Sequence, residues 1–194
     1  MEEEPVAEGK TDLRVVRTRA AIDRAFEELV CEVGLDKVTV KDLAERAGIN
    51  RKTFYLHYET IDELFEAAVG KILEDYFEHY ETTPDEPKDL AGHARRFFLY
   101  LADAPVFTEK LICSSNRFYF GEKVYRMQMS RYRAAGDPFG WLPPDEEALV
   151  LNHIRNTASD FYRKWVGDGK RVDKERAADL LASLTCAGVE NLMR

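Results

Sequence analysis

The side chains best suited to binding another molecule lie in one short stretch near the N-terminus. Arg51 and Lys52 could neutralise phosphate groups or donate to guanine edges, and Thr53 could contact a phosphate or a thymine methyl. Tyr55 and His57 follow and offer further donors to a phosphate backbone. This pattern indicates DNA recognition, although the same polar residues would also suit an ordinary solvated helix surface.

The elements that would position these side chains are two short helices joined by a turn. Thr39 can cap the first helix with Asp42 as its partner in a capping box, and Asn50 can cap the second. Gly48 lies where the turn would need a left-handed backbone. Such a pattern predicts a helix-turn-helix. The apolar residues expected to point inward from it are Leu43, Ala47, Ile49 and Phe54.

The starts of both short helices also carry free N–H groups that could face a phosphate oxygen. Capping residues, a turn glycine, inward apolar spacing and outward donors coincide here, and this favours DNA binding over a merely solvated helix. The residues that we expect to contact DNA are Thr39, Lys41, Asn50, Arg51, Lys52, Thr53, Tyr55, Leu56, His57 and Tyr58.

Residues 19–65 resemble the N-terminal domain of the TetR family of one-component bacterial transcription regulators. The resemblance is carried by Asp-Leu-Ala-Glu-Arg-Ala-Gly-Ile-Asn-Arg-Lys-Thr-Phe-Tyr-Leu-His-Tyr at 42–58 and by Asp-Glu-Leu-Phe at 62–65. It covers about a quarter of the chain, and the remainder resembles the family only in being helical. The resemblance implies a homodimer that binds a palindromic operator in double-stranded DNA, a small-molecule effector and, in most members, repression.

One position departs from the family pattern. Members usually carry a lysine at the start of the next helix, where it contacts a phosphate, whereas Ile61 stands here beside Glu59 and Asp62. Thr60 and Glu63 can still form a capping box, so we expect the helix to form without that contact. The loss should reduce the salt slope of DNA binding by about one unit. An alternative therefore stays open: an interaction-type co-regulator whose head docks on another regulator with little direct DNA contact.

The net charge of −8 argues against a nucleic-acid partner only until its distribution is considered. Residues 1–9 carry four Glu and no basic residue, and residues 59–194 carry eighteen Lys or Arg against twenty-four Asp or Glu. Residues 10–58 carry ten basic against eight acidic residues, so the region with the helix-turn-helix is the only net-positive one. Because its margin is small, affinity must come from the placement of basic groups rather than from bulk charge.

Apolar residues recur at helical spacing through most of the chain, which predicts an all-α protein. We expect a mobile acidic tail over 1–12, a three-helix helix-turn-helix DNA-binding domain over 13–60, and a helical effector-binding and dimerisation domain over 61–194. The helices expected around the helix-turn-helix and in the second domain are 14–33, 60–80, 89–102, a short one after Pro105, 118–135, 145–166 with Asp145 as its cap, and 173–192 capped by Asp173.

The last helix carries small residues that would let another helix approach closely. The resemblance implies that the last two helices pair with those of a second copy to form a four-helix interface. Dimerisation would also bring two heads onto half-sites about 34–36 Å apart, so we expect a homodimer rather than a monomer. The small residues are Ala177, Ala178, Ala182, Ser183, Ala187 and Gly188.

Aromatic and sulfur-containing residues are concentrated in the middle of the chain. At helical spacing such residues are typical of a plain hydrophobic core, but the resemblance implies an effector pocket in this region. The effector itself stays unknown. The residues that we expect to line its pocket are Tyr76, Phe97, Phe98, Leu101, Phe107, Phe120, Met127 and His153.

The sequence favours neither catalysis nor a metal or other cofactor. The four histidines have no metal-ligand spacing, Ser114-Ser115 lacks the glycines of a nucleophile elbow, and there is no phosphate-binding glycine loop. Cys31, Cys113 and Cys186 are odd in number and widely spaced, which fits buried structural thiols better than a disulfide framework or a redox sensor. Without a basic leader or a long apolar run, we expect a cytoplasmic protein that is no enzyme and has no membrane contact.

Overall fold

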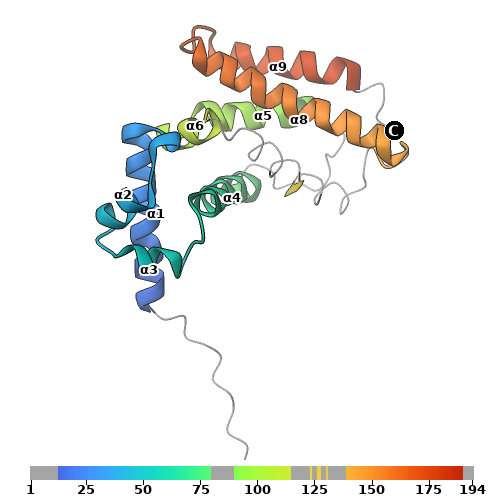
Figure 1. Ribbon diagram of the computed structural model, residues 1–194. Helices are drawn as coiled ribbons and strands as arrows, with labels where there is room; N and C mark the ends of the chain where they lie inside the picture. The colour runs from blue at the N-terminus through green and yellow to red at the C-terminus, as the bar shows by residue number, and fades with distance from the viewer. Residues whose placement is uncertain are drawn as a thin grey trace, which may run out of the picture. The chain divides into compact units, whose positions relative to one another are not determined.

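The computed structural model describes residues 13–79, 90–114 and 139–189, together with residues 123, 126, 127 and 130. Every regular element within these residues is a helix (Figure 1), and the predicted all-α class is confirmed. Most of the helix expected over 118–135 and the tail over 1–12 lie outside the described residues. The elements are α1 (Leu13–Val33), the 3-10 turn η1 (Leu35–Lys37), α2 (Val40–Arg46), α3 (Arg51–Tyr55), α4 (Ile61–His79), α5 (Leu90–Ala102), α6 (Val106–Ile112), α8 (Pro144–Gly167) and α9 (Lys174–Val189).

The chain divides into two compact units, residues 1–64 and residues 65–194. The division falls within α4, between the buried side chains of Leu64 and Phe65. It lies close to the boundary after residue 60 that the sequence suggested. Among the described residues, none of the helices is both long and apolar enough to cross a membrane.

The N-terminal unit is built around α1, whose apolar residues recur every three or four positions. α2 packs against α1, and α3 packs against α2. α1 ends at Val33, and the next residue, Gly34, has a φ of +83° and donates its N–H to the Val30 carbonyl at 3.1 Å. Burial of each large apolar side chain here stabilises the folded unit by about 1.5–3 kcal/mol. The apolar face of α1 therefore supplies much of the surface on which the short helices are held. The side chains that form this core include Ile22, Phe26, Leu29, Val30, Leu43 and Phe54.

Side-chain caps set where several helices begin, as the sequence predicted. The Thr39 hydroxyl accepts the Asp42 N–H at 3.2 Å at the start of α2. At the start of α9 the Asp173 carboxylate accepts two N–H groups of the first turn, at 3.0 and 3.2 Å. The prediction that Asp145 caps α8 is wrong, because α8 begins at Pro144 and Asp145 lies in its first turn. Proline suits this first helical position, since it needs no N–H there and its φ is already helical.

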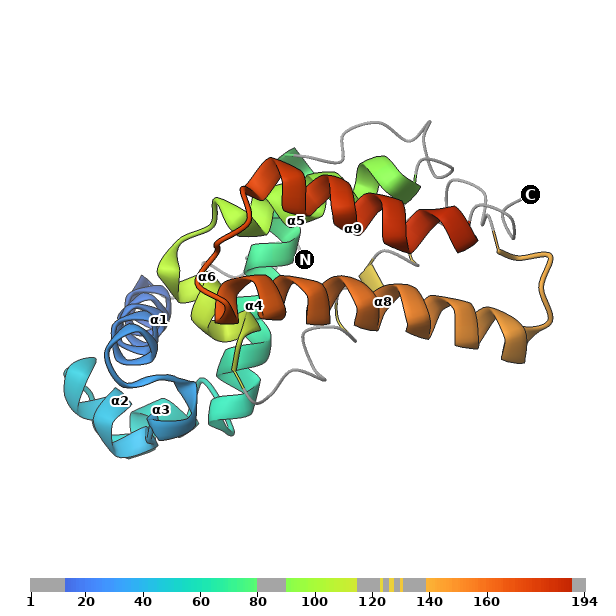
Figure 2. The ribbon, with the colours of Figure 1, turned by 90° about the horizontal axis from the view of Figure 1, so that it is seen from above.

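In the C-terminal unit, α5 packs along α9, and α8 lies beside both (Figure 2). Ala177 and Ala178 of α9 are buried, so these two small residues serve a contact inside the chain. This corrects the expectation that the whole row of small residues on α9 faces a partner. On α5, the Phe98 ring lies 5.2 Å from the Trp165 ring and 5.9 Å from the Tyr162 ring of α8. Edge-to-face packing of this kind fixes how α5 and α8 meet.

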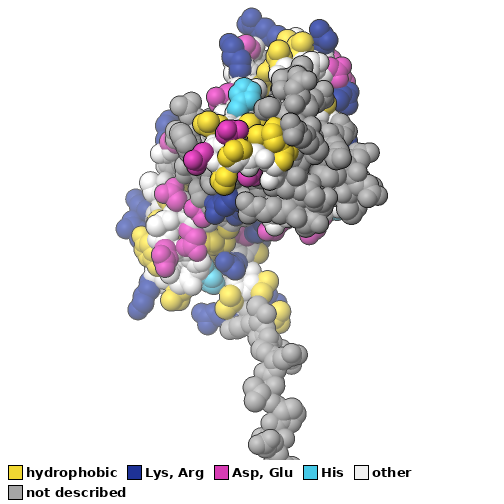
Figure 3. All heavy atoms as spheres, turned by 90° about the vertical axis from the view of Figure 1, so that its right-hand side faces the viewer, with side chains coloured by type: hydrophobic (Ala, Val, Ile, Leu, Met, Phe, Trp, Pro, Cys, Tyr) yellow, Lys and Arg dark blue, Asp and Glu magenta, His cyan; other side chains and the backbone are white. Residues whose placement is uncertain are grey.

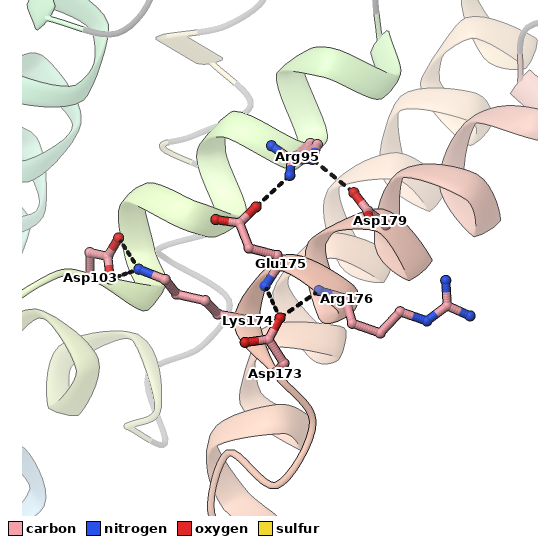
Figure 4. Close-up of polar contacts among 7 residues, drawn as sticks. All are labelled: Arg95, Asp103, Asp173, Lys174, Glu175, Arg176 and Asp179. Atoms are coloured by element: carbon pink, nitrogen blue, oxygen red, sulfur yellow. Dashed lines mark hydrogen bonds and ion pairs between the residues drawn. The ribbon is translucent and has the colours of Figure 1, made fainter.

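Ion pairs link α5 to α9 along the edge of their contact (Figure 4). Arg95 binds Asp179 at 2.8 Å through Nε and also binds Glu175, while Lys174 binds Asp103 at 2.7 Å. All five groups are partly exposed to solvent, where ion pairs contribute little net stability. They set the register of the two helices, while buried apolar residues hold them together.

Candidate nucleic-acid interface

The turn between α2 and α3 has the backbone that the sequence predicted. Gly48 has a φ of +66°, in the left-handed region that favours glycine. Ile49 donates its N–H to the Ala44 carbonyl at 2.9 Å, and Ala47 donates to Leu43 at the same distance. These bonds satisfy carbonyl groups at the end of α2, and the chain enters α3 a few residues later.

α3 is only five residues long, so its direction depends on how its two ends are fixed. At its start the Asn50 side-chain oxygen accepts the Thr53 N–H at 2.7 Å and the Thr53 hydroxyl at 3.1 Å. Along its inner face Phe54 is fully buried. The remaining residues of α3 are therefore turned outward by the same arrangement that buries Phe54.

Nearly all the side chains expected to contact DNA are accessible. Arg51, Lys52, Thr39, Lys41 and Asn50 are exposed, and Thr53 and His57 are half-buried. Two large side chains project strongly, since Tyr55 is 55% and Leu56 is 78% exposed. The hydroxyl of Thr39 and the amide oxygen of Asn50 are used for capping. The outer face of α3 thus presents two cations and a phenol, and the apolar side chain of Leu56 follows at its C-terminal cap.

Tyr58 is the exception, and its prediction as a DNA contact is wrong. Its side chain is only 3% exposed and its ring packs against Phe54 at 6.0 Å. The hydroxyl of Tyr58 donates to the Asp23 carboxylate of α1 at 3.0 Å. The sequence held a signal for this burial, because Tyr58 follows the inward-pointing Phe54 by four residues and so shares its face.

Arg46, at the end of α2, is a basic residue near the turn that is turned away from it toward α1. It binds Glu32 through two hydrogen bonds of 2.8 Å and Glu28 through one of 3.1 Å. The bond to Arg46 lowers the pKa of Glu32, and the two carboxylates raise the pKa of Arg46. One positive charge of this unit is therefore neutralised internally, whereas Arg51 and Lys52 of α3 and Lys41 of α2 stay exposed.

The start of α4 forms as predicted, with Ile61 as its first residue. The Thr60 hydroxyl accepts the Glu63 N–H at 3.0 Å, and the Glu63 carboxylate accepts the Glu59 N–H at 2.6 Å. Ile61 is half-buried and carries no charge. α4 thus begins normally, although Ile61 stands where members of the resembled family usually carry a lysine.

The aromatic residues proposed for an effector pocket are mostly core residues. Phe97, Phe98 and Leu101 line a small apolar void of about 10 Å³ among α5, α6, α8 and α9, far too small for an organic ligand. Tyr76 is buried, Phe107 and Met127 are half-buried, and Phe120 lies outside the described residues. These facts favour the alternative interpretation of this set as plain core.

His153 is exposed on α8 and lines neither of the two cavities described in this subsection. It follows Leu149 by four residues, and Leu149 is 72% exposed. Residues four apart share one face of a helix, which places His153 on the outward face of α8.

A hollow of small-molecule size lies elsewhere in the C-terminal unit. Its volume is about 360 Å³, within the range of small-molecule sites. The Tyr100 hydroxyl lies 3.0 Å from both the Ile72 carbonyl oxygen and the Asp75 carboxylate at one side of this groove. No sequence signal placed it, because it forms only when α4 and α5 pack. The lining residues are Asp75, Arg96, Leu99, Tyr100, Asp103, Ala104 and Pro105.

The described residues contain no cluster of three or more His, Cys, Asp or Glu side chains that could hold a metal ion. Their arrangement defines a helix-turn-helix protein with a separate helical C-terminal unit. In agreement, residues 22–68 match the family model described as bacterial regulatory proteins, tetR family.

Two curated relatives align with the same end of the chain. An uncharacterized HTH-type transcriptional regulator, YxbF of Bacillus subtilis (strain 168), is 33% identical over 85 residues, 43% of this chain and 22% of the relative. The tetracycline repressor protein class A from transposon 1721 of Escherichia coli is 33% identical over 76 residues, 38% of this chain and 35% of the relative. The chain thus matches only a minor part of the length of these relatives.

Solved structures share the fold along nearly the whole chain. NalD, the secondary repressor of the MexAB-OprM multidrug efflux pump in Pseudomonas aeruginosa, superposes with a TM-score of 0.63 at 16% identity, over 91% of this chain and 98% of NalD. FadR from Bacillus subtilis in complex with stearoyl-CoA gives 0.58 at 20% identity, over 87% and 98%. A TetR variant from Acinetobacter baumannii AYE in complex with minocycline gives 0.58 at 19% identity, over 89% and 96%.

The N-terminal unit of the chain thus carries a domain of the TetR family of bacterial regulatory proteins. The resemblance read from residues 19–65 is confirmed by the matched model, which covers residues 22–68.

Proposed function

We propose that this chain is a ligand-responsive transcriptional regulator that binds a palindromic operator as a homodimer, with repression as the outcome. The observation that carries the proposal is the outer face of α3, where Arg51, Lys52 and Tyr55 are exposed on a helix fixed by a capped turn. Guanidinium, ammonium and phenol groups on one such helix suit phosphate oxygens and guanine edges in a major groove. The tested contact set is Thr39, Lys41, Asn50, Arg51, Lys52, Thr53, Tyr55, Leu56 and His57.

The experiment starts from a random library of DNA duplexes, from which the full chain selects its preferred sequence. Binding to that duplex is then measured by fluorescence anisotropy for the wild type, Arg51→Ala and Tyr55→Ala. We expect each variant to lose at least about tenfold in affinity, since contacts to base edges and phosphates are worth about 1–3 kcal/mol. Arg24→Ala is the matched control, because Arg24 is an exposed cation of α1 outside the contact set. Selection of no sequence, or wild-type affinity in both variants, would contradict DNA binding through α3.

The proposal of a homodimer rests on apolar side chains left exposed on the last two helices. Leu149 of α8 is 72% exposed and Leu184 of α9 is 67% exposed. Hydrophobic side chains are also visible beside acidic ones on the surface of the C-terminal unit in the upper part of Figure 3. Burial of such residues against a second copy would remove them from water.

The dimer is tested by sedimentation of Leu184→Arg, which we expect to be monomeric and to lose affinity for the selected palindrome. Val33→Arg is the control, because Val33 is an equally apolar, 45% exposed residue at the end of α1. A dimeric Leu184→Arg protein would show that the partner binds elsewhere.

For the small-molecule effector we propose the groove of about 360 Å³ between α4 and the α5–α6 segment in place of the aromatic set. Bound molecules in FadR and in the TetR variant, stearoyl-CoA and minocycline respectively, support the idea that this fold accepts organic ligands. Native mass spectrometry of the purified chain would reveal a co-purified molecule. In the Leu99→Trp variant the larger side chain would fill the groove. If the groove is the binding site, the mass peak of the protein with its bound molecule should be absent from this variant.

The alternative of a co-regulator with little direct DNA contact draws on two observations. Ile61 removes one cation at the start of α4, and Arg46 is neutralised by Glu28 and Glu32. A salt titration separates the two functions. Binding that falls steeply with salt supports the DNA-binding regulator, whereas a chain without measurable DNA binding at low salt supports the co-regulator.

A further inference from the structure

Tyr58 is held from α1 on two sides although it belongs to the segment that follows α3. Asp23 accepts its hydroxyl at 3.0 Å, and the Arg19 guanidinium lies 5.3 Å from the centre of its ring. Asp23 and Arg19 are four residues apart and therefore lie on the same face of α1. Burial, reinforced by the negative charge of Asp23, raises the pKa of Tyr58 to about 12, so the phenol stays a hydrogen-bond donor at neutral pH.

The backbone of Tyr58 is fastened to α3. Its N–H donates to the Phe54 carbonyl at 3.0 Å, and the N–H of His57 donates to the same carbonyl at 2.9 Å. Its ring packs against the Phe54 ring, which in turn meets the exposed Tyr55 ring edge to face at 5.5 Å. A shift in the position of Tyr58 would therefore also shift the side chains on the outer face of α3.

We propose that Asp23 is a positioning residue: through the Tyr58 hydroxyl it fixes the direction in which α3 presents its DNA-contacting side chains. The inference rests on the proposed function and names a residue of α1 that the contact set does not contain. A five-residue helix is held at its start by Asn50, and the Asp23–Tyr58 bond holds the other end. Without this bond a smaller share of molecules has α3 in the binding orientation, and the apparent affinity falls by that share.

Three variants separate a hydrogen bond from a charge effect. Asp23→Ala removes the acceptor, Tyr58→Phe removes the donor but keeps the buried ring, and Asp23→Asn keeps an oxygen acceptor without the charge. We expect Asp23→Ala and Tyr58→Phe each to weaken binding to the selected duplex about tenfold, as for a bond to a charged group. Asp23→Asn should stay within about threefold of the wild type, and the double variant Asp23→Ala/Tyr58→Phe should be no weaker than either single variant.

Glu27→Ala is the matched control, because it removes an exposed carboxylate from the same helix. Loss of a negative charge alone favours binding to a polyanion, so it cannot explain weaker binding by Asp23→Ala. Binding to an unrelated duplex at the same salt concentration should change less than about twofold in all variants. A loss confined to the selected duplex distinguishes positioning of α3 from general unfolding of the unit.

A DNA-free readout keeps this inference separate from the proposed function. Amide hydrogen exchange at residues 54–58 should speed up in Tyr58→Phe and Asp23→Ala but not in Asp23→Asn or Glu27→Ala. A wild type that selects no DNA, together with this exchange pattern, would overturn the proposed function and leave the positioning of α3 standing. Unchanged exchange, or undiminished binding by Asp23→Ala and Tyr58→Phe, would overturn the role of Asp23.

Discussion

The guanidinium of Arg46 and the carboxylate of Glu32 meet through two parallel hydrogen bonds, Nη1 to Oε1 and Nη2 to Oε2, both of 2.8 Å. Glu28 adds a third bond at 3.1 Å from the preceding turn of α1. This two-pronged geometry is the most directional that an ion pair can adopt. It ties the end of α2 to the end of α1, on which the position of the following turn depends.

The pair predicts a dependence of stability on acid. Arg46 lowers the pKa of Glu32 in the folded chain below the ordinary 4.5. The ionised pair therefore adds to the free energy of unfolding at pH values above 4.5. It is lost as the pH falls through the folded pKa. We therefore expect Glu32→Gln to lower the Tm by a few degrees at neutral pH and to have the same Tm as the wild type in strong acid.

Circular dichroism melts at both pH values check this expectation. Glu27→Gln, which removes an exposed carboxylate of the same helix, should show no such dependence. A Tm difference that is the same at neutral and acidic pH would mean that the ionised pair is not its source.

Ile61→Lys tests how far the departure from the family pattern limits DNA binding. Ile61 opens α4 within the N-terminal unit, and Glu59 and Asp62 beside it are exposed. A lysine there should add one phosphate contact per subunit. We expect tighter binding at low salt and a plot of log affinity against log salt that is steeper by about one unit per contact.

Ile61→Gln is the control, since it adds a polar side chain of similar length without charge. If Ile61→Lys changes neither affinity nor salt slope, the start of α4 does not lie near a phosphate in the complex.

Gly48→Ala tests the backbone of the turn. A Cβ at Gly48 would meet no atom within 4 Å, but the φ of +66° is unfavourable for any residue with a side chain. We expect a loss of about 1–2 kcal/mol in the free energy of unfolding, measured by urea denaturation. Gly167→Ala is the matched control, because that site is equally open and has no positive φ. A neutral Gly48→Ala would show that the turn can adopt another backbone without cost.

The sequence identified the parts of the fold that local chemistry decides. Thr39, Asn50 and Asp173 cap helices because a short polar side chain need only reach an N–H two or three residues ahead. The role of Gly48 was predictable for the same reason, because a left-handed backbone conformation depends on that one residue. Tyr58 was expected to contact DNA together with its neighbours in the sequence, whereas its spacing of four residues from Phe54 pointed to the core.

Contacts between distant segments could not be predicted in this way. Nothing near Asp23 in the sequence indicates that it binds a tyrosine thirty-five residues later. The groove beside Tyr100 and the void beside Phe98 differ in size only because of how α4, α8 and α9 pack around α5. An aromatic residue at helical spacing fits a filled core and an open pocket equally well, so composition alone does not separate the two.

Gly70 of α4 provides the last prediction, because a lysine side chain occupies the space beside it. The ammonium group of Lys123 donates to the Glu66 carbonyl of α4 at 3.2 Å, and a Cβ on Gly70 would lie 2.9 Å from that nitrogen. The obstacle is the far end of a flexible side chain, so it can move aside at small cost. Alanine in a helix interior is favoured over glycine by about 1 kcal/mol. We therefore expect Gly70→Ala to raise the free energy of unfolding by up to about 1 kcal/mol in urea denaturation, while the Lys123–Glu66 bond is lost.

Lys123→Met and the double variant Gly70→Ala/Lys123→Met complete the cycle. If Gly70→Ala acts by displacing Lys123, the alanine should stabilise the Lys123→Met background by more than it stabilises the wild type, since no bond remains to be broken. A Gly70→Ala protein less stable than the wild type by more than about 1 kcal/mol would mean that Lys123 cannot leave its place on α4. In that case the contact is a fixed part of the core of the C-terminal unit, because overpacking a rigid site costs about that much or more.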